Sequence, residues 1–127
     1  MVELMPDLLD RVASPPIAGE ESPIDFAHLS RMTLGDRRLE REVLALFDRQ
    51  VVLLMGRIAD ADPGVAAAAA HILKGSAQSI GAWQVVRAAD EIEAAAVCHA
   101  DLSHGVCALT VSLRDLRLAI AELIRPH

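Results

Sequence analysis

The sequence predicts an all-α protein, an up-down antiparallel four-helix bundle with a short additional helix near its N-terminus. Apolar residues recur every three or four positions along long segments, which is the period of amphipathic helices. Of the 127 residues, 53% are hydrophobic but only 2% are aromatic. The core must therefore be built from Ala, Leu, Val and Ile, a mixture that favours packed helices over sheets. No segment alternates apolar and polar residues as a half-buried strand would.

The beginning of the chain, residues 1–23, is expected to be a tail or linker, and residues 24–127 to form the bundle. Residues 14–23 are rich in proline and contain glycine, which cannot sustain a helix interior. Before them, one side of a short helix would carry Leu4, Leu8 and Val12. A helix this brief is marginal unless it docks onto another part of the protein.

A short helix is predicted to follow a cap at Ser22 or Asp25 and to end at Gly35. Its apolar residues at helical spacing are Phe26, Leu29 and Met32. A long second helix is predicted from about Asp36 to Ala61. Its apolar stripe, which needs a partner surface, consists of Leu39, Val43, Phe47, Val51, Leu54 and Ile58.

The third helix has unusually clear boundaries. Asp62 is a good cap and Pro63 suits the first helical position, so the helix should begin there. It runs to about Ile80 and stops at Gly81.

A fourth helix is predicted from about Ala82 to His99, with the stripe Val85, Ala89, Ile92 and Ala96. The fifth helix begins near Asp101 or Ser103. Its apolar residues alternate spacings of four and three, the pattern of an antiparallel bundle seam: Leu102, Val106, Leu109, Leu113, Leu116, Ile120 and Leu123.

The third helix divides into two faces when its residues are placed about 100° apart. The predicted core face carries Val65, Ala69, Ile72, Leu73, Ser76 and Ile80. The opposite face carries Gly64, Ala67, Ala68, His71, Lys74, Gly75 and Gln78. His71 is therefore expected to face solvent among small or cationic neighbours, in a shallow, positively charged spot.

Two neighbours of this histidine are informative. Gly75 lies inside a helix otherwise rich in alanine, where glycine costs about 1 kcal/mol relative to alanine. Close approach of another molecule would explain it, and close helix packing is disfavoured by its place on the exposed face. Lys74 is the only lysine in the chain and places a compact, mobile charge one turn from the imidazole.

This arrangement suits phosphoryl transfer. A neutral imidazole, with an unperturbed pKa of about 6.5, is a competent nucleophile whose nitrogen accepts a phosphoryl group directly. An ammonium group nearby can partly neutralise the charge on the phosphoryl oxygens. The competing interpretation is that His71 is an ordinary surface histidine and Lys74 an ordinary solvated cation.

Residues 71–82, HILKGSAQSIGA, closely resemble the signature of histidine phosphotransfer domains, in which His-x-Leu-Lys-Gly-Ser is followed by a glycine at the helix end. The likeness continues through Val85, Ala89, Ile92 and Glu93. Residues 35–47 look like the family's second helix, so the resemblance covers roughly residues 24–124.

The resemblance implies a four-helix bundle with a short extra N-terminal helix, and a phosphate carried on the imidazole Nε2. It implies receiver domains of response regulators or hybrid sensor kinases as partners, whose aspartyl phosphate passes to the histidine and onward to a second aspartate. The receiver would supply Mg²⁺ and most catalytic groups, so the chain would need no cofactor of its own and would be a carrier rather than an enzyme.

Carried over residue by residue, the resemblance makes His71 the phosphoacceptor, Lys74 the phosphate-stabilising cation and Gly75 the gap that admits the receiver. Glu93 would accept a hydrogen bond from Nδ1 of the imidazole; a solvated or helix-pairing glutamate is the alternative. The remaining residues expected at the binding surface are Ala67, Gln78, Phe26, Leu29 and Trp83. For Trp83, simple packing at the start of its helix is the alternative.

Other function classes are disfavoured. A net charge of −6 argues against nucleic acid as a partner. No apolar run approaches the ~18 residues that span a bilayer, and residues 1–12 are too acidic for anionic lipids. The sequence contains no nucleotide-binding loop for an autokinase and no basic leader for secretion, so we expect a cytoplasmic protein without autokinase activity. We also expect it to be a monomer whose two cysteines are free thiols.

Two alternatives remain open at this point. The first is zinc binding near the last turn, where the possible ligands are Cys98, His99, His104 and Cys107, although their spacing fits no common zinc motif. The second is a helical-bundle adaptor that binds receiver domains but does not transfer phosphate.

Overall fold

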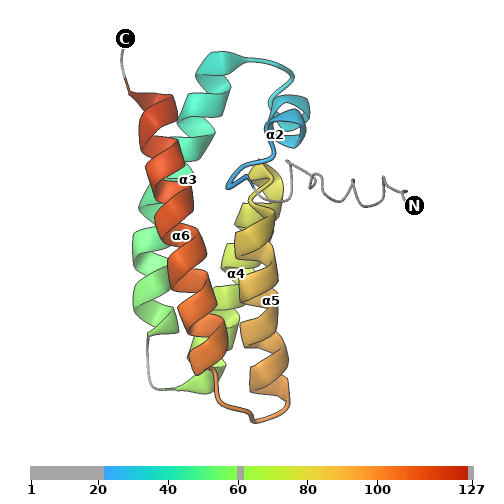
Figure 1. The fold of residues 1–127 in the computed structure, drawn as a ribbon, viewed down its shortest axis with the longest axis vertical. Helices are drawn as coiled ribbons and strands as arrows, with labels where there is room; N and C mark the ends of the chain where they lie inside the picture. The colour runs from blue at the N-terminus through green and yellow to red at the C-terminus, as the bar shows by residue number, and fades with distance from the viewer. Residues whose placement is uncertain (1–21, 60–61, 126–127) are drawn as a thin grey trace, which may run out of the picture.

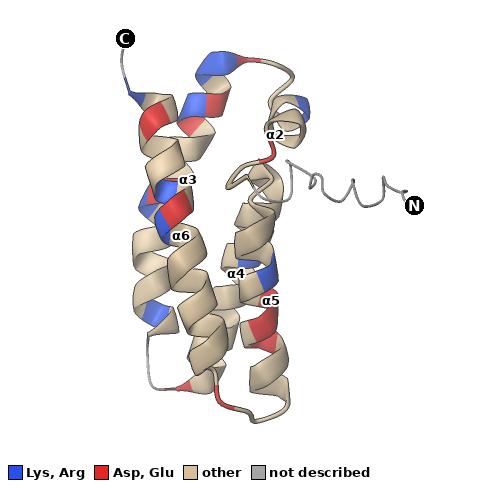
Figure 2. Cartoon of the chain, viewed as in Figure 1, with Lys and Arg blue, Asp and Glu red and all other residues tan. Residues whose placement is uncertain are grey.

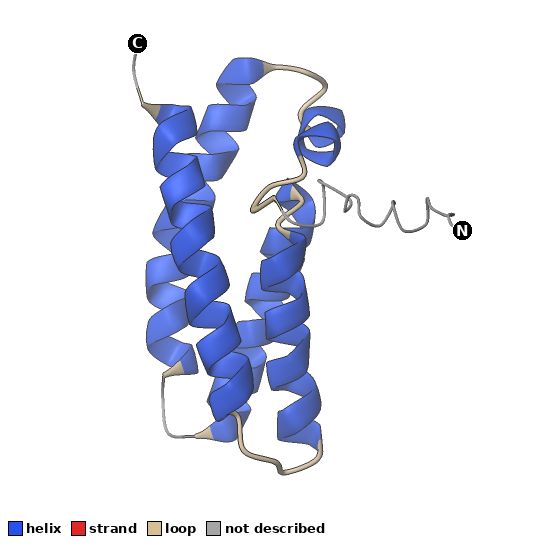
Figure 3. Ribbon diagram, in the orientation of Figure 1, coloured by secondary structure: helices blue, strands red, loops and turns tan. Residues whose placement is uncertain are grey.

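The computed structural model describes residues 22–59 and 62–125. Over these residues the chain forms five helices and no strand (Figure 3). The helices are α2 (Phe26–Met32), α3 (Arg37–Ile58), α4 (Pro63–Ile80), α5 (Trp83–Val97) and α6 (Ser103–Ile124). The prediction of an all-α protein is confirmed for the described part of the chain. The predictions for Leu4, Leu8 and Val12 concern residues outside that part.

The four long helices lie side by side along the longest axis of the molecule (Figure 1). Each packs against the next in the chain, and α6 also packs against α3, so the contacts close into a ring around a shared core. The short helix α2 sits at one end and contacts α4. None of the described helices is both long and apolar enough to cross a membrane.

Aspartate caps determine where three of the helices begin. The side chain of Asp25 accepts a hydrogen bond from the amide of His28, and Asp36 does the same for Leu39. Asp62 caps α4 by accepting from the amide of Gly64 at 2.9 Å. Each carboxylate satisfies one of the unpaired amides of a first helical turn. Of the two caps predicted for the first helix, Asp25 is the one used.

Three helix ends differ from the prediction. The first helix, expected to end at Gly35, ends at Met32. The second helix, expected to reach Ala61, ends at Ile58. The fourth, expected to reach His99, ends at Val97 because His99 adopts a positive φ of 55°, which no right-handed helix accommodates. The end of α4 is as predicted, with Gly81 at φ 75°.

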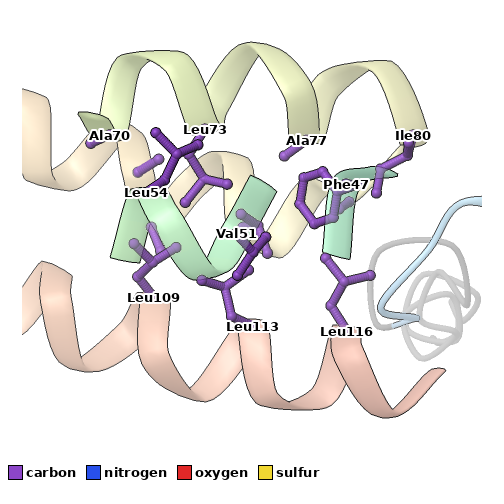
Figure 4. Close-up of a cluster of buried hydrophobic side chains, with 14 of the residues drawn as sticks. Phe47, Val51, Leu54, Ala70, Leu73, Ala77, Ile80, Leu109, Leu113 and Leu116 are labelled. Carbon is purple, nitrogen blue, oxygen red and sulfur yellow. The ribbon is translucent and has the colours of Figure 1, made fainter. Parts of the chain in front are cut away.

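The core consists mainly of aliphatic side chains from all five helices, as the composition required, together with the buried ring of Phe47. Figure 4 shows leucines of α6 facing residues of α3 and α4 across the interior: Leu109, Leu113 and Leu116 opposite Val51, Leu54 and Leu73. Gly105, which the sequence did not single out, makes a close approach possible between α5 and α6. A Cβ built on it would lie 2.8 Å from Cγ1 of Ile92.

The core face of α4 is rotated from the predicted one. Val65 and Ile72 were expected inside but are 39% and 46% exposed. The buried residues are Ala66, Ala69, Ala70, Leu73, Ala77 and Ile80. Because α4 packs against α3 on one side and α5 on the other, it needs a wide apolar face, and alanines supply that face while letting both neighbours approach closely.

Candidate functional site

His71 lies in the middle of α4, and its side chain is 71% exposed. Its neighbours Ala70 and Leu73 are buried, so the core anchors the helix on one side while the imidazole projects from the other. The ring is oriented by α5, since Nδ1 lies 2.7 Å from Oε2 of Glu93. An ionised carboxylate can only accept a hydrogen bond, so the proton of the neutral ring belongs on Nδ1. Nε2 then carries the lone pair.

Glu93 connects the imidazole to Lys74. Its Oε1 lies 2.5 Å from Nζ of Lys74, while its Oε2 accepts from His71. The side chain of Glu93 is 21% exposed, so both of its oxygens are engaged in a partly desolvated place between α4 and α5. The carboxylate thus fixes two side chains of α4 at once.

Lys74 has a second carboxylate partner, Asp90, at 3.1 Å from Oδ1 to Nζ. Hydrogen bonds from the ammonium to Glu93 and Asp90 raise the pKa of Lys74 above its usual value. The side chain is only 22% exposed, because it folds over onto α5 instead of extending into solvent. Figure 2 shows acidic residues on α5 close to basic residues of the α4–α5 pair.

The electrostatic character of the site therefore differs from the prediction. A positively charged spot was expected, but Asp90 and Glu93 together outweigh the single charge of Lys74 while His71 is neutral. The sequence analysis considered only α4. The carboxylates come from α5, three residues apart and thus on one face of that helix.

The surface beside the imidazole is open at Gly75. A Cβ built on this glycine would meet no atom within 4 Å, so helix packing does not explain its presence. Ala67, one turn before His71, is half-buried, and the side chain of Gln78 is on the exposed side. The backbone carbonyl of Gln78 accepts a hydrogen bond from Nε2 of His28 at 2.8 Å, which ties α2 to α4.

The junction of α2 with the α4–α5 turn contains most of the remaining predicted binding residues. Nε1 of Trp83 donates to Oδ2 of Asp25 at 3.0 Å, and the indole meets the His28 ring edge to face with centroids 5.0 Å apart. The hydrogen bond from Trp83 is the largest cause of a lowered pKa for Asp25. These contacts support the alternative interpretation of Trp83, in which it packs at the start of its helix.

Phe26 and Leu29, both on α2, differ in their surroundings, since one is exposed and the other buried. Phe26 is 52% exposed and presents its ring on the outside of α2. Leu29 is 1% exposed and packs in the core, so the surface role expected for it is wrong. The short helix uses one side to attach to the bundle and the other to face solvent.

Asp90 is the site residue that sequence reasoning missed. His71 and Lys74 are three residues apart on α4, and Asp90 and Glu93 are three apart on α5. Two such pairs on neighbouring helices are the signal that would have identified it. His28 was likewise missed, and Asp25 was predicted only as a cap, without its hydrogen bond from Trp83.

The residues considered for zinc do not assemble into a site. Within the described part of the chain, no group of three or more His, Cys, Asp or Glu side chains is placed to hold a metal ion. Cys98 and Cys107 are exposed and unpaired with each other. Nδ1 of His104 instead contacts Oε2 of Glu91 on α5.

A comparison with known protein families agrees with this all-helical fold. The family model described as the Hpt domain matches residues 36–125, which is more than half of the chain. The protein therefore belongs to the Hpt domain family, whose members take part in phosphotransfer in two-component phosphorelays with receiver domains and kinases. Searches of curated proteins and of solved structures gave no match at the significance required.

Proposed function

We propose that this protein is a histidine-containing phosphotransfer protein that relays a phosphoryl group between aspartates of receiver domains through phosphohistidine at His71. The observation that carries the proposal is the exposed imidazole whose Nδ1 proton is held by Glu93. That contact leaves the lone pair on Nε2, the nitrogen able to attack phosphorus. Membership of the Hpt domain family supports the same reaction.

In the proposed transfer, the Nε2 lone pair attacks the phosphorus of a receiver's aspartyl phosphate. A P–N bond forms, the P–O bond breaks, and the electron pair returns to the receiver's carboxylate. The ring gains positive charge, which Glu93 stabilises across the Nδ1 hydrogen bond. Transfer to a second aspartate reverses these steps. The receiver would supply the Mg²⁺ that neutralises charge on the phosphoryl oxygens.

Lys74 and Gly75 have supporting roles in this proposal. Lys74 provides a cation one turn from His71 that can move onto the phosphoryl oxygens. Gly75 leaves open surface for the receiver, because nothing lies within 4 Å of where a Cβ would stand. Gln78, Ala67 and Phe26 are the further contact residues we propose.

The finer architecture belongs to the same proposal. Short connections join helices that contact each other, such as residues 98–102 between α5 and α6, which supports an up-down antiparallel order. We propose residues 24–127 as the phosphotransfer bundle and residues 1–23 as its N-terminal linker. We further propose a monomeric, cytoplasmic carrier without autokinase activity, whose partners are receiver domains of response regulators or of hybrid sensor kinases.

The test is incubation with receiver domains that carry radiolabelled aspartyl phosphate. The wild type should acquire an acid-labile, alkali-stable label, and His71→Asn should acquire none. His104→Asn is a matched control, because His104 is also an exposed helical histidine with Nδ1 on a glutamate, at 87% exposure, but no lysine accompanies it. We expect this control to be labelled like the wild type.

Two results would contradict the proposal. Label on His71→Asn would place the phosphoacceptor elsewhere. Receiver binding by a wild type that never becomes labelled would support the adaptor function instead.

A further inference from the structure

The ammonium group of Lys74 is not free beside Nε2 of His71, because it is paired with two carboxylates of α5. It lies between Oδ1 of Asp90 at 3.1 Å and Oε1 of Glu93 at 2.5 Å. Both partners come from α5, and Glu93 holds the imidazole through Nδ1, not Nε2. Two of the three N–H donors of the ammonium therefore already have carboxylate partners, and a phosphoryl group on Nε2 would compete with these carboxylates for the same charge.

The two carboxylates are not equivalent in this exchange. Glu93 is 21% exposed and is shared with His71, so withdrawing the ammonium from it would leave a partly buried oxygen without a partner. Asp90 is 68% exposed, and water can solvate it as soon as the ammonium leaves. Asp90 is thus the partner that Lys74 can exchange for phosphate.

Asp90 also acts directly on the charge of the site. A phosphoryl group on Nε2 adds negative charge close to two carboxylates, and only one lysine is present to balance them. Removing the carboxylate of Asp90 would relieve this repulsion and free the ammonium in a single change. Removing Glu93 would instead also release the ring.

We propose that Asp90 is a positioning residue that competes with the phosphoryl group for Lys74 and thereby biases the carrier toward handing phosphate on. This inference rests on the proposed function of His71. The ion pair in the unphosphorylated protein reduces the free energy by which Lys74 stabilises phosphohistidine, because the Lys74–Asp90 contact is lost when the Lys74–phosphoryl contact forms. Wild-type phosphohistidine is therefore less stable than it would be with Lys74 unrestrained.

The first experiment measures the equilibrium between phosphohistidine and the aspartyl phosphate of one receiver. Asp90→Asn should shift it toward phosphohistidine roughly three- to tenfold, the size expected for one charge near a protein surface. Asp90→Glu keeps the charge and should restore the wild-type ratio. Asp115→Asn removes an equally negative residue on α6, paired with Arg114, and should change nothing.

Salt and a second substitution separate an electrostatic role from a structural one. The wild-type ratio should move toward phosphohistidine as ionic strength rises, and the ratio of Asp90→Asn should respond less. In a Lys74→Ala background, Asp90→Asn should have a clearly smaller effect, because the competition needs both partners. Equal effects with and without Lys74 would overturn the inference.

An independent measurement needs no phosphate. Since Lys74 is the only lysine, ¹³C-lysine labelling gives a single Cε resonance whose titration reports its pKa. That pKa should fall in Asp90→Asn and remain raised in Asp115→Asn. An unchanged pKa in Asp90→Asn would show that the pair does not hold in solution and would overturn the inference.

The outcomes distinguish the two proposals. If the wild type accepts no label from any receiver and none from phosphoramidate, the small donor whose P–N bond breaks as ammonia leaves, the proposed function fails and the inference with it. If the wild type is labelled but Asp90→Asn shows the wild-type equilibrium, the inference alone fails.

Discussion

Two exposed histidines of this chain have the same local geometry and different surroundings. His71 and His104 each direct Nδ1 to a glutamate of α5, so an oriented imidazole is not by itself distinctive. What sets His71 apart is the lysine that shares its glutamate, together with the open surface at Gly75. The chemistry proposed here depends on that combination of neighbours.

Lys74→Ala should slow phosphoryl transfer to His71 and leave the helical circular dichroism spectrum unchanged. The ammonium stabilises charge on the phosphoryl oxygens, whereas its own contacts are to side chains at the surface of α5. Transfer rates measured by rapid quench, with the spectrum as a folding control, test this. A variant that loses its helical signal would mean that Lys74 is needed for folding.

Gly75 allows stability and binding to be separated at one position. Gly75→Ala should raise the free energy of unfolding by about 0.5–1 kcal/mol, because alanine favours a helix and its Cβ meets no atom within 4 Å. Gly75→Leu should also fold stably but weaken receiver binding, since its side chain fills the open surface. Urea denaturation and calorimetric titration measure the two effects. Unaltered affinity in Gly75→Leu would remove close approach as the reason for this glycine.

At the scale of elements, α2 depends on the turn between α4 and α5. Besides the contacts of Trp83 and His28, the amide of Asp25 donates to the carbonyl of Gly81 at 2.9 Å. The absence of a side chain at Gly81 makes this approach possible, because a Cβ there would lie 2.9 Å from the carbonyl oxygen of Asp25.

Gly81→Ala should therefore destabilise the protein by about 1–3 kcal/mol, through both the positive φ of 75° and the clash with α2. Gly56→Ala is the matched control, because a Cβ at Gly56 meets no atom within 4 Å and the residue lies inside α3. Chemical denaturation should show a loss for the first variant and a small gain for the second. Equal stabilities would contradict this account of the junction.

Elements were predictable from the sequence where local chemistry determines them. The start of the second helix near Asp36, the cap Asp62 and the stop at Gly81 depend on residues close together in the chain, and each was predicted correctly. The core face of α4 was misjudged, because its width depends on how α3 and α5 pack around it. Asp90 was missed for a similar reason, since an ion pair between helices depends on their relative rotation.

The core of the whole molecule is mainly aliphatic, with the ring of Phe47 buried among leucines and alanines, and leucines of α6 fill the space between the other helices (Figure 4). Leu116 is 0% exposed, whereas Leu118 on the same helix is 65% exposed. Substituting each of these two leucines by alanine therefore compares the same chemical change at a buried and at an exposed position.

Leu116→Ala should lower the free energy of unfolding by about 2–5 kcal/mol, from lost burial and the cavity left behind. Leu118→Ala should change it by less than about 0.5 kcal/mol. Differential scanning calorimetry measures both, and a single cooperative transition is expected for each variant. Similar losses in the two variants would mean that α6 is packed differently from the structure described here.

Trp83, the single tryptophan of this chain, lies where α2 meets the turn between α4 and α5, and the chain has no tyrosine to contribute to the near-ultraviolet signal. Fluorescence emission from Trp83 therefore reports whether α2 is packed against the turn between α4 and α5. A red shift of this emission without loss of ellipticity would show that α2 has separated from the turn while the four long helices stay folded. The same signal could be followed over time during binding of a partner.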